Sequence, residues 1–315
     1  MSNTFKSWFL LLLISIIWGS SFLLIKLGLM DEFGNERLTP EFLGALRLSI
    51  AFIILLPICF KYLFKTPPKD LKFLLIVGIL GNGAPAFLFP YAEIHLSSAL
   101  SGILNSLVPV FTILIAVFVF KFIWKTNHIL GISISIIGTL FILNEDFIIT
   151  SNSNFLAIGC ILIGSLCYSI SLNVIKYKLD HLSPGHITSF SFLFIGPPCI
   201  VYLFIKDFPE YIQQNTMGYD GIIAVFILAV IGTSFAVLLF NHLIKISNPV
   251  FASSVTYFIP IVAVILGVYY KEEITFNQII GLSLILMGVL LINIKSPLSK
   301  LKVLINFVKK TNNAA

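Results

Sequence analysis

The sequence predicts an all-α integral membrane protein whose ten transmembrane helices form two inverted five-helix repeats. Composition is the first reason: 58% of the residues are hydrophobic, 11% are charged, and the mean hydropathy is +1.02. Such a chain cannot cover a water-facing surface, so lipid must be its main solvent. The second reason is a series of long apolar stretches, and the third is a duplication of the whole pattern.

The apolar stretches are each about 17 to 24 residues long, which is enough to cross the hydrocarbon core of a bilayer. In the first half, spans are predicted near residues 8–30, 40–60, 71–91, 98–119 and 127–143. In the second half, they are predicted near 155–175, 184–205, 219–241, 249–269 and 277–294. Turn and charge signals end these stretches, as in Thr66-Pro67-Pro68-Lys69 and Leu182-Ser183-Pro184-Gly185.

The duplication has a period of about 150 residues, far longer than a solenoid unit. An odd number of spans in each copy turns the second copy upside down in the bilayer, and inverted repeats are typical of transporters. The predicted domains are residues 7–146, residues 155–296 and a basic tail over 297–315 that forms an interfacial helix on the inner leaflet. The repeated positions are Ile25-Lys26 with Ile175-Lys176, Pro109 with Pro260, Gly131 with Gly281, and Gly138 with Gly288.

The distribution of basic residues predicts the orientation. If the N-terminus is cytoplasmic, most lysines lie in inner segments, and the outer segments hold only Arg37, Lys206 and Lys271. The positive-inside rule therefore places both termini in the cytoplasm. The paired glycines, seven residues apart on one helix face, predict close helix packing.

Several short motifs resemble the EamA-type families of the drug/metabolite transporter superfamily. Their order, the ten spans and the duplication agree, and the resemblance covers nearly the whole chain. The motifs are Trp18-Gly19-Ser20-Ser21-Phe22, Leu46-Arg47-Leu48, Ser97-Ser98-Ala99 leading to Val108-Pro109-Val110, and Glu272-Glu273-Ile274-Thr275 followed by Gln278, Gly281 and Leu286-Met287-Gly288-Val289.

This resemblance implies two halves around a central cavity in the inner membrane of a bacterial cell. It implies a secondary transporter that exports a small organic metabolite, an amino acid or an amphipathic compound, by alternating access. Two departures between the halves put strict symmetry of function in doubt: Phe122 stands where the second half has Glu272, and His128 stands where it has Gln278. Two alternatives stay open: a lipid or lipid-phosphate flippase of the same architecture, and a membrane scaffold that transports nothing.

The substrate-binding candidates are polar or aromatic side chains within the spans, because uncharged hydrogen-bonding groups can replace the water shell of a substrate. Asn105 and Thr256 precede Pro109 and Pro260 by one turn, where a backbone carbonyl loses its helical partner. Each candidate has the alternative of joining or packing helices. The set is Trp18, Arg47, Asn82, Asn105, Tyr168, Asn173, Thr256 and Tyr257.

Arg47 is the one guanidinium predicted inside a span. It either extends to the headgroups, pairs with Glu36 or Glu41, or binds an anionic group of the substrate. Lys26 and Lys176 lie at matching span ends, and extension to the headgroups is the expectation for both.

Every carboxylate lies in a loop or at a span end, so the sequence predicts no proton-binding acid at the midplane. Facilitated movement or exchange follows, with Glu93 and His95 near the outer face as the candidate protonation pair. The alternative is that both side chains are simply solvated.

Other classes of function lack their signatures in the sequence. Cys59, Cys160, Cys167 and Cys199 lie in apolar runs without ligand spacing, so no metal is expected. A phosphate-binding loop and a catalytic constellation are missing, so we expect no cofactor and no enzyme activity. Scattered basic residues argue against nucleic acid, which leaves a small-molecule substrate and membrane lipid as partners. The oligomeric state stays open.

Overall fold

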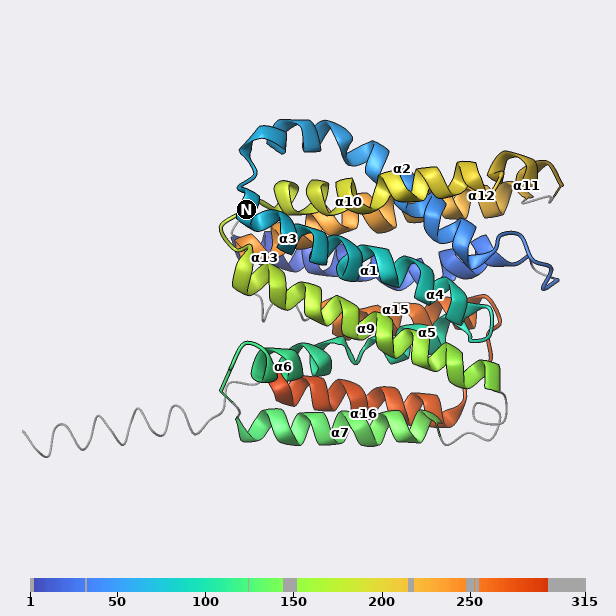
Figure 1. Ribbon diagram of the computed structural model, residues 1–315. Coiled ribbons are helices and arrows are strands. Elements are labelled where there is room, and N and C mark those ends of the chain that lie inside the picture. Colours follow the sequence, from blue (N-terminus) through green and yellow to red (C-terminus); the bar gives the residue numbers. More distant parts are fainter. Residues whose placement is uncertain are drawn as a thin grey trace, which may run out of the picture.

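The computed structural model describes residues 3–31, 33–123, 125–143, 152–214, 218–247, 252 and 255–293. Over these residues every element is a helix, and the only β contact is an isolated bridge between Met30 and Glu36. The predicted all-α class is confirmed for this part of the chain (Figure 1). The predicted interfacial helix in the tail, 297–315, lies outside the described residues.

The helices of the first half begin at residues that favour helix starts. Thr39 and Ser97 accept a hydrogen bond from a backbone N–H of the first turn, and Pro40 and Pro68 occupy first positions. The elements are α1 (Asn3–Leu29), α2 (Pro40–Tyr62), η1 (Leu63–Lys65), α3 (Pro68–Gly78), η2 (Ile79–Gly83), α4 (Ala84–Glu93), α5 (Ser98–Asn105), α6 (Val108–Phe118) and α7 (Thr126–Leu143).

The second half repeats this order. Ser183 caps the helix that begins at Pro184, as Thr39 caps the helix that begins at Pro40. The elements are α9 (Asn152–Lys178), α10 (Pro184–Ile205), α11 (Phe208–Gln214), α12 (Gly218–Ile227), η3 (Leu228–Phe235), α13 (Ala236–Ile246), α15 (Val255–Tyr269) and α16 (Phe276–Asn293).

Seven helices of the described chain are long and apolar enough to cross a membrane. They are Phe5–Leu29, Pro40–Lys65, Pro68–Glu93, Ser98–Phe118, Asn154–Lys178, Pro184–Ile205 and Gly221–Ile244. Three predicted spans correspond to shorter apolar helices, Thr126–Ile142, Val255–Tyr269 and Phe276–Ile292. The count of ten spans therefore stays a prediction, while a multi-pass helical membrane protein is confirmed.

The helices run back and forth, so their connections gather at two opposite ends of the molecule (Figure 1). The N-terminus, the α2–α3 turn and the α9–α10 turn lie at one end, on the left of Figure 1. The α1–α2 loop, the α4–α5 turn and α11 lie at the other. We call these the N-terminal end and the opposite end.

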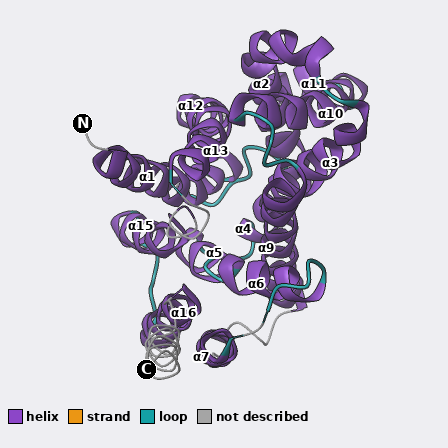
Figure 2. Cartoon of the chain, turned by 90° about the vertical axis from the view of Figure 1, so that its left-hand side faces the viewer, coloured by secondary structure: helices purple, strands orange, loops and turns teal. Residues whose placement is uncertain are grey.

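Helices that correspond in the two halves pack against each other. α7 contacts α16, and α2 contacts α10, at opposite edges of the end-on view in Figure 2. A Cβ atom at Gly138 would lie 2.7 Å from the carbonyl oxygen of Gly281, and one at Gly281 equally close to the carbonyl of Gly138. Gly131 and Gly288 meet in the same way. The close packing predicted for these glycines is confirmed, and the reciprocal contact is what two-fold symmetry between the halves requires.

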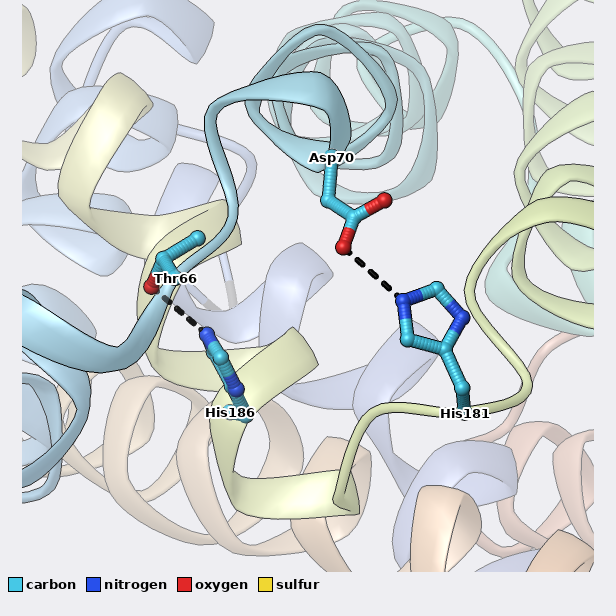
Figure 3. Close-up of polar contacts among 4 residues, drawn as sticks. All are labelled: Thr66, Asp70, His181 and His186. Atoms are coloured by element: carbon cyan, nitrogen blue, oxygen red, sulfur yellow. Dashed lines mark hydrogen bonds and ion pairs between the residues drawn. The ribbon is translucent and has the colours of Figure 1, made fainter.

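Side-chain contacts tie the two halves together at both ends. At the N-terminal end, His181 Nε2 lies 2.8 Å from Asp70 Oδ2, and His186 Nε2 lies 2.7 Å from Thr66 Oγ1 (Figure 3). We call these two contacts the histidine tie.

At the opposite end, the Tyr211 hydroxyl donates to the Arg37 carbonyl at 3.4 Å, and the Tyr211 ring lies 4.6 Å from that of Phe42. We call these contacts the tyrosine tie. The histidine tie joins the α2–α3 connection and α3 to the α9–α10 turn and α10, and the tyrosine tie joins the start of α2 to α11.

Candidate functional site

A cavity lies between the two halves and is lined by residues of both. The space inside it that is open to the centre of a water molecule is about 140 Å³. Six of the eight binding candidates line it: Trp18, Arg47, Asn82, Asn105, Tyr168 and Thr256. The helices that carry them are α1, α2, α5, α9 and α15, together with the short segment η2.

Asn173 and Tyr257 do not line this cavity. The Asn173 amide donates to the carbonyls of Thr112 and Ser169, so it joins α9 to α6. The Tyr257 hydroxyl donates to the Val289 carbonyl at 3.1 Å, which joins α15 to α16. Both side chains join helices, which is the alternative to substrate binding that the sequence left open.

Asn105 ends α5, and the helix restarts at Val108, so the proline at position 109 does break the fourth helical stretch. Its side-chain oxygen accepts a hydrogen bond of 3.4 Å from the Ser165 hydroxyl of α9. Asn105 therefore lines the cavity and also joins the halves.

Two π-helical segments face the cavity, one in each half. η2 contributes Gly81 and Asn82 to the lining, and η3 contributes Gly232 and Thr233. π-helical turns are rare and occur frequently at functional sites, because the wider turn displaces backbone groups from the usual hydrogen-bond pattern. The Trp18 indole N–H donates to the Gly232 carbonyl at 3.2 Å, so one such group meets a cavity side chain.

The glycines of the two π-helical segments allow each segment to lie close to a serine of the other half. A Cβ atom at Gly232 would lie 2.9 Å from Ser21 Oγ, and one at Gly81 would collide with Ser171. Gly81 corresponds to Gly232 with the offset of Pro109 and Pro260, and Ser21 to Ser171 with that of the Lys26 repeat. These glycines were not predicted as part of the site, although their recurrence at the repeat offset is a signal that the sequence contains.

Aromatic rings form a matching pair of contacts on the cavity wall. Trp18 lies 4.8 Å from Phe240, and Tyr168 lies 5.8 Å from Phe89, measured between ring centroids. Phe89 and Phe240 correspond in the two halves, as do Trp18 and Tyr168. The cavity wall therefore repeats its aromatic pattern across the axis between the halves.

Arg47 breaks this symmetry. It lies eight residues after the cap Thr39, whereas the position eight residues after the cap Ser183 is Ser191, which also lines the cavity. Arg47 Nε donates to the Thr233 hydroxyl at 2.6 Å, and the guanidinium interacts electrostatically with Tyr168. Within the described part of the chain it forms no ion pair with Glu36 or Glu41, so the side chain faces the cavity instead of either alternative partner.

Glu93 lies in a charged cluster beside the cavity. Its side chain is 0% exposed, and neither carboxylate oxygen has a hydrogen-bond partner among the described residues. The charged groups that interact with it are Lys26, Glu272 and Arg47. His95 is exposed, so the structure does not place the two members of the predicted protonation pair in one environment.

Lys26 and Glu272 order the turn that follows Glu93. The Lys26 ammonium donates to the carbonyls of Glu93 at 2.6 Å and Leu96 at 3.3 Å. The expected extension of Lys26 to the headgroups is therefore wrong, because the ammonium binds the carbonyl of Glu93 at the end of α4 and that of Leu96 in the turn that follows. Lys176, its counterpart, is exposed.

The Glu272 carboxylate accepts from the backbone N–H groups of Ser98 and Ala99 at 2.9 and 3.0 Å, so it caps α5 of the first half. Phe122, which stands at the matching position, has no carboxylate to offer. The sequence difference between Glu272 and Phe122 thus marks a capping contact that Glu272 makes and Phe122 cannot make.

Comparison with known proteins gives relatives along nearly the whole chain. An "Uncharacterized transporter" of Archaeoglobus fulgidus is 22% identical, covering 91% of this chain and 98% of the relative. A "Probable amino-acid metabolite efflux pump" of Salmonella typhimurium is 26% identical, covering 90% and 93%. A crystal structure with 13% identity matches at a TM-score of 0.60 over 91% of this chain and 96% of the other, which shows a shared fold.

The family comparison matches each half separately. The EamA-like transporter model matches residues 6–144 and again residues 155–294. These two matches, the relatives named as transporters and the apolar helices agree with the resemblance found in the sequence. The chain belongs to the EamA-like transporter family.

Proposed function

We propose that this protein is a secondary transporter that exports a small organic metabolite by alternating access. The cavity between the halves carries the proposal, because corresponding elements build its wall: α1 and α9, η2 and η3, α4 and α13. A site on the axis between inverted halves can open to either side when one half moves against the other. The family and the amino-acid efflux relative favour an amino acid or an amphipathic compound as substrate.

The proposed topology has ten spans in a bacterial inner membrane, with both termini cytoplasmic. The basic residues support it, because the α2–α3 and α9–α10 connections lie at the N-terminal end (Figure 1) and their flanking residues include Lys61, Lys65, Lys69 and Lys178. The predicted outer segments hold only Arg37, Lys206 and Lys271. The histidine tie is then cytoplasmic and the tyrosine tie external. Release of one tie while the other holds would open the cavity to one side only.

The energy source in this proposal is the gradient of the substrate or of an exchanged solute. The sequence carries no phosphate-binding loop for ATP. Glu93 is the proposed protonation site, since its carboxylate is buried beside Lys26, Arg47 and Glu272. His95 is the weaker candidate, because it is exposed.

The test is solute flux into proteoliposomes that contain the purified full-length protein. We expect saturable flux of at least one member of a panel of amino acids and amphipathic organic solutes. Thr256→Trp should abolish it by filling the cavity. The matched control is Ser283→Trp, because Ser283 is exposed on α16, away from the cavity lining.

Three results would contradict the proposal. Equal flux in the Thr256→Trp and Ser283→Trp proteins would show that the cavity is not the pathway. Scrambling of a labelled phospholipid without flux of any panel solute would favour the flippase alternative. If correctly folded protein showed neither flux nor scrambling, a membrane scaffold that transports nothing would be the remaining alternative.

A further inference from the structure

Among the described residues that line the cavity, Arg47 is the only Arg, Lys, His, Asp or Glu. The others are apolar, aromatic, hydroxyl or amide side chains and glycines. An intramembrane guanidinium is costly unless an anion or a set of hydrogen-bond acceptors compensates it. The electrostatics of the lining therefore favour a negatively charged occupant.

No carboxylate of the described residues forms an ion pair with Arg47. The one ion pair within 4.0 Å among the described residues joins His181 to Asp70, at the N-terminal end. Glu93 interacts with Arg47 electrostatically, but it does not line the cavity. Among the described lining residues, the guanidinium is thus the one formal charge, and no carboxylate lines the cavity beside it.

The orientation of Arg47 suits a planar anion. The Thr233 hydroxyl, which itself donates to the Leu228 carbonyl at 2.8 Å, accepts from Arg47 Nε. This contact fixes the plane of the guanidinium through η3, and Tyr168 also interacts with the guanidinium through a side-chain hydrogen bond. The remaining N–H groups of the guanidinium stay as donors. Two parallel N–H donors match the two oxygens of a carboxylate.

The other residues of the cavity wall indicate the chemistry of the rest of the ligand. The Trp18–Phe240 and Tyr168–Phe89 ring contacts make two aromatic surfaces, and aliphatic residues such as Ile25 and Leu172 complete the apolar lining. A protonated amine would find no carboxylate in the lining. A dianionic phosphate would leave one charge unmatched by the single guanidinium.

We propose that the cavity binds a small organic monoanion, whose carboxylate pairs with Arg47 and whose apolar, preferably aromatic, body lies against the two ring pairs. This inference rests on the proposed function and specifies its substrate class. Because Ser191 replaces Arg47 in the second half, only one side of the cavity binds the carboxylate. The ligand therefore binds in one orientation, although the walls are nearly symmetric.

The test uses three probes that share one aromatic body: indole-3-acetate, indole-3-acetamide and tryptamine, which are an anion, a neutral amide and a cation. Binding to the detergent-purified full-length protein is measured by titration calorimetry. We expect the acetate to bind about tenfold more tightly than the amide, because a charge-assisted pair is lost, and tryptamine to bind more weakly still.

Variants assign the preference to its residue. Arg47→Gln should bind acetate and amide equally, and Arg47→Lys should keep part of the preference, since a lysine offers charge without the bidentate geometry. Lys176→Gln is the control for loss of one positive charge, because Lys176 is exposed and does not line the cavity. It should retain the wild-type preference.

The outcomes separate this inference from the transport proposal. Equal affinity for acetate and amide in the wild-type protein, or no binding of any probe, would overturn the monoanion class. A preference that survives Arg47→Gln would overturn the role of Arg47. Selective acetate binding without flux in proteoliposomes would instead refute the transport proposal while the binding site stands.

Discussion

At the scale of single residues, the most unusual group is the Glu93 carboxylate. It is fully buried, both oxygens lack a hydrogen-bond partner among the described residues, and the nearby ammonium of Lys26 is turned to backbone carbonyls. Burial of an ionised group without hydrogen bonds is costly. The charge of Glu93 therefore depends closely on its neighbours Lys26, Arg47 and Glu272.

We predict that Glu93→Gln flattens the dependence of substrate flux on pH, because the amide cannot exchange a proton. His95→Gln is the matched control and should retain the wild-type profile, since His95 is exposed. Flux in proteoliposomes measured across a pH series checks this. A pH profile that is unchanged in Glu93→Gln but altered in His95→Gln would move the protonation site to the histidine.

At the scale of elements, the two π-helical segments have most bearing on function. η2 and η3 occupy corresponding places in the third helical stretch of each half, and both present a glycine to a serine. Each half therefore has one wider helical turn at the corresponding place in the cavity wall. We expect the spacing between these segments and α1 or α9 to be critical.

We predict that Gly81→Ala destabilises the protein by about 1–3 kcal/mol, the usual cost of overpacking. The Cβ of alanine would collide with both Oγ and Cβ of Ser171. Gly232→Ala should cost less, and Ser21→Ala should rescue it, because Ser21 Oγ is the atom 2.9 Å away while its Cβ lies at 4.0 Å. Thermal unfolding in detergent measures both.

Gly159→Ala is the control, since nothing lies within 4 Å of a Cβ atom built at that position in α9. It should stabilise the helix by roughly 0.5–1 kcal/mol. Equal effects of Gly81→Ala and Gly159→Ala would disprove the close contact with Ser171.

The histidine tie is the second element-scale feature. Asp70 is buried, whereas the His181 side chain is 51% exposed, so solvent weakens the pair (Figure 3). We predict a coupling of about 0.2–1 kcal/mol between Asp70→Asn and His181→Gln in a double-mutant cycle of thermal stability. Lys69→Gln paired with His181→Gln serves as the uncoupled control. A coupling of zero would remove the Asp70–His181 contact from the proposed gating.

At the scale of the whole molecule, the sequence was sufficient for the helical class and the family, because hydropathy and the recurrence of Gly131 and Gly138 report global constraints. It did not predict which polar residues would face the cavity. Asn173 and Tyr257 lie on the same kinds of apolar helix as Asn105 and Thr256, and only the rotation of each helix separates them. That rotation depends on packing between the halves.

The sequence also did not predict which groups the charged residues contact. Lys26 looked like an end-of-span lysine, and only the path of the chain brings the α4 carbonyls to it. The π-helical segments have no local sequence signal of their own, and only the recurrence of Gly81 as Gly232 marked them. Whether the six cavity candidates bind substrate stays a prediction.

Alternating access means that the two halves expose one site in turn to the two sides of the membrane. Counterflow of labelled indole-3-acetate, in proteoliposomes preloaded with the unlabelled compound, tests this property. A carrier that binds on one side at a time predicts a transient accumulation of label above its equilibrium level, lost in Thr256→Trp and kept in Ser283→Trp. Label that rises only to equilibrium, at a rate independent of preloading, would contradict alternating access.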